Sequence, residues 1–401
     1  MVPTSKRVRV LTSRGGLEPA TLDLALEDKT AYLRYPEAEP SASPEPHSPL
    51  IGHTVIPGLI DIHVHGGFGI RFGSPTQAES ELEAALLADL QTYSAAVART
   101  GVCGFLCSIA APDLQQLRKL VTAYAKVLDQ GPFAGAKPLG LHLEGPFLNR
   151  EKKGAFDPAW LQQPNAHEVA RILEDGQGWI RQMTLAPELP GTDAVVALLE
   201  DAGVIPALGH SNADYETATT ALRHGFRHVT HTFNAQRGFH HRDPGVVGAV
   251  LTSEGITAEL IADLIHVHPG AIKLLLRCLG PDRIILITDA MAAAGLGDGT
   301  YGLVGREVTV RDGAARLADG TLAGSTATMD QCLRNMVNIV GTPLIDAVRM
   351  AAYNPARLLG LSGHPDDDLR EGCPATFAVL DPSLRVVLTV IDGKIVHQAL
   401  H

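Results

Sequence analysis

Two histidines close a short apolar run near residue 60 and stand two positions apart. In a β-strand, residues i and i+2 point to the same side, so His63 and His65 would present both imidazoles to one point in space. Imidazole nitrogen binds zinc, iron, cobalt or nickel, and one strand that carries two ligands lowers the ordering cost of a site. The pair predicts a metal centre. Because the chain has 17 histidines, the alternative is a polar strand end without a ligand role.

Apolar runs and amphipathic segments alternate along most of the chain. From residue 54 onward this alternation is typical of βα units around a parallel sheet. Helices are expected at 82–98, 114–128, 215–224 and 270–279. Eight apolar runs predict an α/β fold with a TIM-type (β/α)8 barrel. These runs are 55–65, 102–109, 139–144, 182–186, 204–210, 228–233, 256–265 and 284–289.

Side chains that could bind a metal or move a proton fall at the carboxyl ends of these runs. In a barrel those ends converge on one face, where active sites of this fold are built. Six potential ligands on one face favour the metal-centre interpretation over chance placement. They are His63, His65, Glu144, His210, His231 and Asp289.

Composition narrows the class of protein. The 401 residues are 45% hydrophobic and 19% charged, which is typical of a compact body with a sizeable core. A formal net charge of −11 argues against nucleic-acid binding, which needs a basic surface. Five scattered cysteines lack CxxC spacing, and no run approaches the ~18 apolar residues of a membrane span. We therefore expect reduced cysteines, no membrane association and a cytoplasmic location.

The two ends of the chain differ from its middle. Short β-like pieces occur at 8–12 and 30–35, and again at 376–380, 385–391 and 394–398, where Asp392-Gly393 predicts a hairpin turn. A small β-sandwich domain built from residues 1–53 and 365–401 would flank a barrel of residues 54–364. The Pro- and Ser-rich stretch 36–49 is expected to be a loop, and a further β-rich segment covers 302–317.

Several longer motifs resemble the amidohydrolase superfamily and, within it, the N-acetylglucosamine-6-phosphate deacetylases. The Leu-Glu-Gly-Pro and Gly-His-Ser-Asn pair is specific to the deacetylases, whereas His-x-His marks only the superfamily. The resemblance implies a barrel with a small β domain, a homodimer, and hydrolysis of N-acetylglucosamine-6-phosphate to glucosamine-6-phosphate and acetate. The matching segments are 57–61 (PGLID), 141–147 (LHLEGPF), 185–188 (LAPE), 209–213 (GHSNA), 230–235 (THTFNA), 288–290 (TDA) and 322–326 (LAGST).

The resemblance also assigns metal roles. Glu144, His210 and His231 would form the core metal site, and the presence of His63 and His65 implies capacity for a second ion. One or two divalent ions per subunit are therefore expected, with zinc or iron the preferred identities. A salt bridge at a helix N-terminus is the alternative for Glu144.

Proton transfer and substrate contacts follow from the same resemblance. Asp289 is the candidate general acid and base, although it could also act only as a metal ligand. The phosphate would contact Asn234, the backbone N–H of Ala235 and Arg242, an arginine supplied by the neighbouring subunit. His266 would contact the sugar; a core histidine is its alternative.

Phe156 departs from the family pattern, which often has a histidine at this position. Phenylalanine cannot donate a hydrogen bond but can stack on a sugar face. An N-acetylgalactosamine-6-phosphate deacetylase therefore remains open. More distant alternatives are a cyclic amidohydrolase, which would use a carbamylated lysine where this chain has Glu144, and a sugar-phosphate sensor that lacks catalysis.

Overall fold

Eight parallel strands form the larger sheet of the computed structural model, which describes residues 4–11, 16–25, 30–34, 52–72, 79–303, 306–361 and 375–399. A parallel bridge between Val64 and Ala290 joins the two end strands, so the sheet closes on itself. The predicted barrel is confirmed. Its strands are β5 (Leu59–Val64), β8 (Val102–Ile109), β9 (Lys137–Glu144), β10 (Ile180–Leu185), β11 (Ile205–Leu208), β12 (His228–Val229), β13 (Thr257–Ile261) and β14 (Ile284–Ile287).

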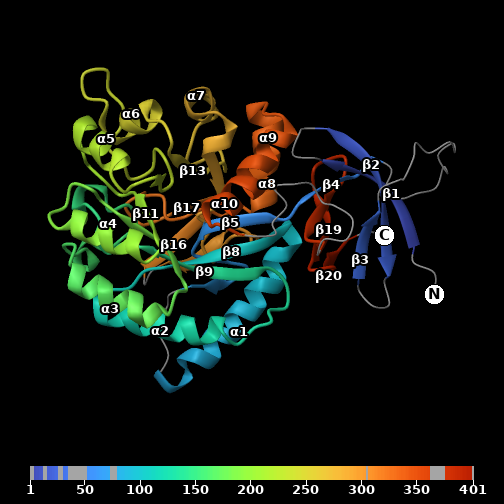
Figure 1. Ribbon diagram of the computed structural model, residues 1–401, viewed down its shortest axis with the longest axis horizontal. Helices are drawn as coiled ribbons and strands as arrows, with labels where there is room; N and C mark the ends of the chain where they lie inside the picture. Colours follow the sequence, from blue (N-terminus) through green and yellow to red (C-terminus); the bar gives the residue numbers. More distant parts are fainter. Residues whose placement is uncertain are drawn as a thin grey trace.

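Helices surround this sheet (Figure 1). The four predicted helices are found as α1 (Glu79–Val97), α2 (Leu114–Leu128), α5 (Tyr215–Arg223) and α7 (Pro269–Leu279). The side chain of Asp113 accepts a hydrogen bond from Gln116 N at 2.8 Å, which fixes the start of α2 at Leu114. The helices are α1 (Glu79–Val97), α2 (Leu114–Leu128), α3 (Ala166–Gly176), α4 (Thr192–Asp201), α5 (Tyr215–Arg223), α6 (Gly245–Thr252), α7 (Pro269–Leu279), α8 (Met329–Asn335), α9 (Leu344–Val348) and α10 (Asn354–Leu358).

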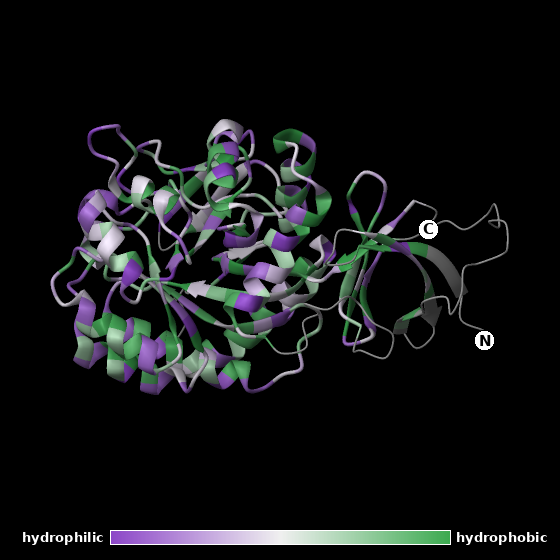
Figure 2. Ribbon diagram, turned by 45° about the horizontal axis from the view of Figure 1, so that its top comes forward, coloured by the Kyte–Doolittle hydropathy of each residue, from purple (hydrophilic) through white to green (hydrophobic). Residues whose placement is uncertain are grey.

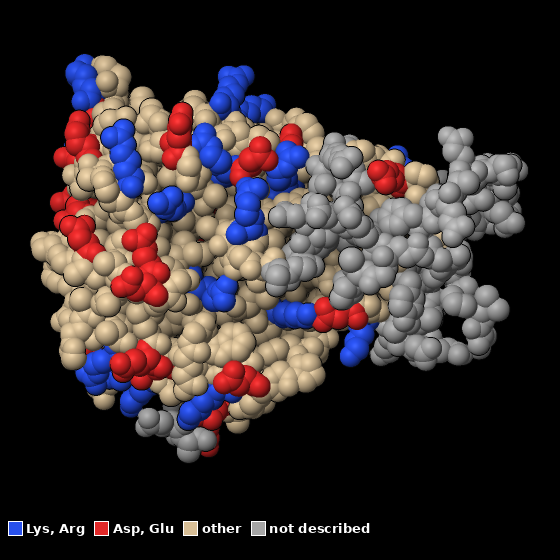
Figure 3. Space-filling view, viewed as in Figure 1, with Lys and Arg blue, Asp and Glu red and all other residues tan. Residues whose placement is uncertain are grey.

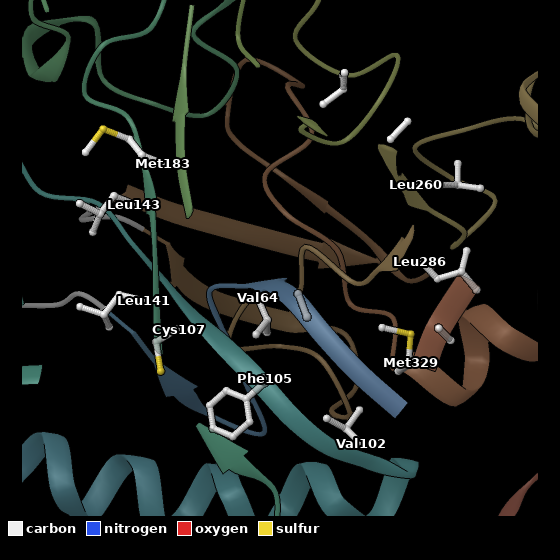
Figure 4. Packing of buried hydrophobic residues seen from close by; sticks show 14 of the residues in the cluster. Val64, Val102, Phe105, Cys107, Leu141, Leu143, Met183, Leu260, Leu286 and Met329 are labelled. Atoms are coloured by element: carbon white, nitrogen blue, oxygen red, sulfur yellow. The ribbon is translucent and has the colours of Figure 1, made fainter. Parts of the chain in front are cut away.

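The barrel strand β14 is apolar on both faces. Ile284 and Leu286 belong to the cluster that packs against the helices, whereas Ile285 and Ile287 belong to a different cluster. Because successive strand residues point to opposite faces, the second cluster lies inside the barrel. Figure 4 shows the outward-facing side chains of β8 and β9 in the first cluster, and Figure 2 shows the hydrophobic strands enclosed by helices of mixed hydropathy.

Strands from both ends of the chain form the second sheet, as predicted. This sheet closes into a single ring of strands, where a sandwich of two sheets was expected. The ring strand β4 (Thr54–Pro57) leads through Gly58 directly into the barrel strand β5. The domain boundaries at 53/54 and 364/365 stay predictions. In ring order the strands are β1 (Thr4–Leu11), β2 (Leu17–Ala25), β3 (Thr30–Arg34), β20 (Lys394–Gln398), β19 (Val386–Ile391), β18 (Phe377–Leu380) and β4 (Thr54–Pro57).

Two smaller β structures complete the fold. The β-rich segment expected at 302–317 is a three-stranded antiparallel sheet of β15 (Gly299–Leu303), β16 (Arg306–Arg311) and β17 (Ala314–Arg316). A short pair, β6 (Gly66–Gly67) and β7 (Ile70–Arg71), follows the His-x-His strand. The predicted turn between β19 and β20 is present, with positive φ at Asp392 and Gly393. The loop predicted at 36–49 lies outside the described residues.

The structure also shows the state of the cysteines and the distribution of surface charge. Cys103, Cys107 and Cys332 are buried and Cys278 is exposed, and these four described cysteines are free. Burial raises the pKa of the Cys103, Cys107 and Cys332 thiols. On the face shown in Figure 3, acidic and basic side chains are interspersed. Within the described ranges, no helix has the length and apolar character needed to cross a membrane.

Candidate metal centre and active site

The carboxyl-terminal face of the barrel brings together all six side chains predicted to meet there. Each lies in the last positions of its strand or within two residues beyond it. All are buried except Asp289, whose side chain is 14% exposed and opens to the pocket. The strands that carry them are β5 for His63 and His65, β9 for Glu144, β11 for His210, β12 for His231 and β14 for Asp289.

Three of these residues form what we call the core set: Glu144, His210 and His231. The Nε2 atoms of both histidines lie 3.1 Å from Glu144 Oε1 and 3.0 Å from each other. His210 donates from Nδ1 to the carbonyl oxygen of Lys152 at 2.7 Å. Its Nε2 therefore faces the centre of the set with a lone pair when the ring is neutral.

A second group, the His-x-His set, consists of His63, His65 and the same Glu144. His65 Nε2 lies 3.0 Å from Glu144 Oε2, and His63 Nε2 lies 3.5 Å from Glu144 Oε1. Asp289 Oδ1 is 3.5 Å from His65 Nε2 and 3.6 Å from His63 Nε2. Glu144 is thus shared by two adjacent groups of possible ligands, with Asp289 beside them.

The donor atoms fit a bound cation. His63 Nε2 is buried and makes no hydrogen bond, although it points toward two carboxylates. Burial opposes ionisation of Glu144, but the neighbouring imidazoles of His63, His210 and His231 hold its pKa well below the usual range. Converging imidazole nitrogens around an ionised carboxylate are a ligand set suited to a divalent transition metal.

Left-handed backbone turns aim three of these side chains. His210, His231 and Asp289 have φ of 48°, 27° and 47°. Such conformations cost about 1–3 kcal/mol in non-glycine residues and concentrate at functional sites. For Asp289 the turn is held by its N–H, which donates to His63 O at 2.9 Å, and by its carbonyl, which accepts from Ser325 N at 2.7 Å. The strain is therefore built into the site.

A cavity of about 200 Å³ opens above these residues. It is also lined by three predicted substrate contacts, Asn234, Ala235 and His266. His266 donates from Nδ1 to Asp263 Oδ2 at 2.6 Å, which leaves its Nε2 for a ligand. Arg242 does not line this cavity. It lies on an exposed loop, where its guanidinium contacts His241 Nε2 at 2.8 Å.

Phe156 is part of the cavity wall. Only 7% of the residue is exposed, and its ring meets the His210 ring edge-on at a centroid distance of 5.4 Å. The side chain thus buttresses a core-set histidine and presents an apolar edge to the cavity.

Two carboxylates that hold the site were given no role from the sequence, although Glu188 ends the matching segment 185–188. Glu259 on β13 binds His63, and Glu188 accepts hydrogen bonds from Ser211 Oγ at 2.7 Å and from Asn212 N at 2.6 Å. Glu188 thereby fixes the loop after His210. A charged residue inside an apolar strand, as Glu259 is, was the available signal.

The chain belongs to the amidohydrolase family, whose model matches residues 54–396. Over 348 residues it is 37% identical to the N-acetylglucosamine-6-phosphate deacetylase of Lysinibacillus sphaericus, with 86% of each chain covered. It is 35% identical over 387 residues to the N-acetylgalactosamine-6-phosphate deacetylase of Escherichia coli O157:H7, covering 96% of this chain and 97% of the other.

Solved structures give the same family. The structure of this chain is similar to that of a variant of the Mycobacterium smegmatis N-acetyl-D-glucosamine-6-phosphate deacetylase in complex with N-acetyl-D-glucosamine-6-phosphate. The TM-score is 0.84 at 33% identity, and 99% of this chain and 100% of the other are covered. The resemblance drawn from the sequence motifs is confirmed.

Proposed function

We propose that this chain is a metal-dependent hydrolase that removes the acetyl group from N-acetylglucosamine-6-phosphate, giving glucosamine-6-phosphate and acetate. The observation that carries the proposal is the position of Asp289. Its carboxylate stands 3.5 Å from His65 Nε2, beside two metal-ligand sets and at the wall of the cavity. The deacetylase relatives and the matched solved structure support the same substrate.

The ligands of the divalent ion would be Glu144 with the four histidines of the two sets. When bound, such an ion polarises the acetyl oxygen and lowers the pKa of water. Zinc or iron fits a set of imidazole and carboxylate donors, and the sharing of Glu144 allows one or two ions.

Asp289 would move the proton. Its carboxylate accepts the proton of the attacking water as the C–O bond forms, and then donates it to the amide nitrogen as the C–N bond breaks. Its 14% exposed side chain reaches the cavity. His266, oriented by Asp263, contacts the substrate on the other side, while Asn234 and the Ala235 N–H bind the phosphate.

Substrate preference separates the proposal from its nearest rival. We expect acetate release to be faster with N-acetylglucosamine-6-phosphate than with N-acetylgalactosamine-6-phosphate, and slowest with the sugars that lack phosphate. Rates at equal substrate concentrations test this order. A preference for the galactosamine isomer would favour the second candidate function, which the 96% coverage by the Escherichia coli relative supports.

Arg242 would act from a neighbouring subunit of a cytoplasmic homodimer. Its exposed guanidinium lies away from its own cavity, and a planar guanidinium pairs well with phosphate oxygens. The four cysteines that the structure describes are free, which suits a reducing compartment.

A mixture of two inactive variants tests this sharing of residues. Arg242→Ala and Asp289→Asn proteins are each expected to be nearly inactive, and their hybrid dimers should contain one intact site. Activity should therefore return toward about one quarter of wild type once subunits exchange randomly. Absence of recovery, with exchange shown by differently tagged chains, would contradict the shared site.

A further inference from the structure

Glu259 is a buried carboxylate outside both ligand sets. It lies on β13 between Ala258 and Leu260, which pack outward, so its own side chain points into the barrel. None of its surface is exposed. A charge at such a position is costly unless hydrogen bonds replace the lost water.

The two carboxylate oxygens face different partners. Oε2 accepts from His63 Nδ1 at 2.9 Å and from the backbone N–H of His231 at 3.0 Å. Oε1 accepts from Gln182 Nε2 at 2.9 Å and from His228 Nε2 at 3.0 Å.

These contacts reach both ligand sets at once. The bond to His63 fixes the ring with its proton on Nδ1, so that Nε2 presents a lone pair toward Glu144. The bond to the His231 N–H holds the left-handed turn that aims a core-set ligand. One side chain therefore constrains a histidine of the His-x-His set and the backbone of the core set.

We infer that Glu259 is a positioning residue shared by the two metal-ligand sets. The inference rests on the proposed metal-dependent function and deepens it, because it names the residue that couples the sets. Gln182 supports it independently. That amide is fully buried, its Oε1 has no hydrogen-bond partner, and its Nε2 donates to Glu259 Oε1 at 2.9 Å. A buried amide oxygen without a hydrogen-bond partner destabilises the fold. The contribution of Gln182 is therefore the hydrogen bond that its Nε2 donates to Glu259.

Glu259→Gln replaces the shared acceptor by an amide of the same shape. An amide has one oxygen, so it cannot accept at both positions, and its NH2 group would oppose a donor. We expect the affinity for Zn²⁺ to fall about 10- to 100-fold, which is typical when a residue that hydrogen-bonds to a metal ligand is replaced. If two ions bind, the ion with the lower affinity should show the larger loss. The affinity is measured on metal-free protein by chelator competition, and stoichiometry by elemental analysis.

Asp263→Asn is the matched control. Asp263 is also a buried carboxylate that accepts from the Nδ1 of a cavity histidine, but that histidine, His266, belongs to neither set. We expect its Zn²⁺ affinity to stay at the wild-type value. Equal losses in both variants would show a general effect of removing a buried charge and would overturn the inference.

The outcomes also separate this inference from the proposed function. Wild-type protein that binds no Zn²⁺ would contradict the metal-dependent function itself. If the wild type binds Zn²⁺ and the folded Glu259→Gln variant binds it with the same affinity, only the role of Glu259 is overturned. If circular dichroism shows that Glu259→Gln is unfolded, Gln182→Met decides. We expect it to weaken Zn²⁺ binding by up to about 10-fold, and unchanged affinity would overturn the inference.

Discussion

Asp289→Asn is expected to lower kcat for acetate release from N-acetylglucosamine-6-phosphate by about 10²- to 10⁴-fold, the usual contribution of a proton-transfer group. Asparagine keeps the shape of the side chain but cannot take up a proton from water and pass it to the leaving nitrogen. Asparagine also tolerates the left-handed backbone that this position needs, with φ of 47°. The variant should therefore fold and bind metal, and steady-state kinetics should show the loss in kcat.

Asp312→Asn provides the control. Asp312 has nearly the same backbone conformation, with φ of 51°, but its side chain is 94% exposed and it lies in the turn between β16 and β17. Its kcat should equal that of wild type. An Asp289→Asn enzyme that retained more than about a tenth of the wild-type kcat would remove Asp289 from the proton-transfer role.

Glu144→Gln is expected to abolish tight metal binding and, with it, activity. Glu144 is the one residue common to both ligand sets, with contacts of 3.0–3.1 Å to three of the four histidines. A neutral amide offers one weakly donating oxygen in place of two anionic ones. The loss in affinity should exceed the ~10- to 100-fold typical of residues that only orient ligands. Metal content after gel filtration, together with kcat, measures both effects.

Glu188→Gln is the matched variant for this experiment. Its carboxylate accepts hydrogen bonds from Ser211 and Asn212 in the loop after His210, yet it belongs to neither set. Its metal content should match that of wild type. A folded Glu144→Gln protein with the full metal content would contradict the shared-ligand arrangement.

The sequence was sufficient to predict the barrel and the face that carries the site. Apolar runs and amphipathic segments alternate with clear periods, and the ends of parallel strands must meet, so His63 and Asp289 could be placed together although 226 positions separate them. The six predicted side chains do meet. Their roles rest on their chemistry and on the family.

Other features depend on contacts that periodicity does not encode. Glu259 and His63 are 196 positions apart in the sequence but form a hydrogen bond in the fold. The residues around Glu259 in β13 do not indicate which side chain inside the barrel it will contact. The closed small sheet depends on pairing between Thr30 and Lys394, which only the folded chain brings together. Arg242 lies on an exposed loop and does not line the cavity of its own chain, so its contact with the phosphate stays a prediction.

Metal titration of the metal-free protein, with acetate release from N-acetylglucosamine-6-phosphate as the readout, tests whether this chain is a metal-dependent deacetylase. We expect negligible activity without metal, a rise with added Zn²⁺ or Fe²⁺ that saturates at one or two ions per chain, and a kcat that stays about 10²- to 10⁴-fold below wild type at every metal concentration in Asp289→Asn. Acetate release that is independent of metal, or a fully loaded wild-type protein that releases none, would contradict it.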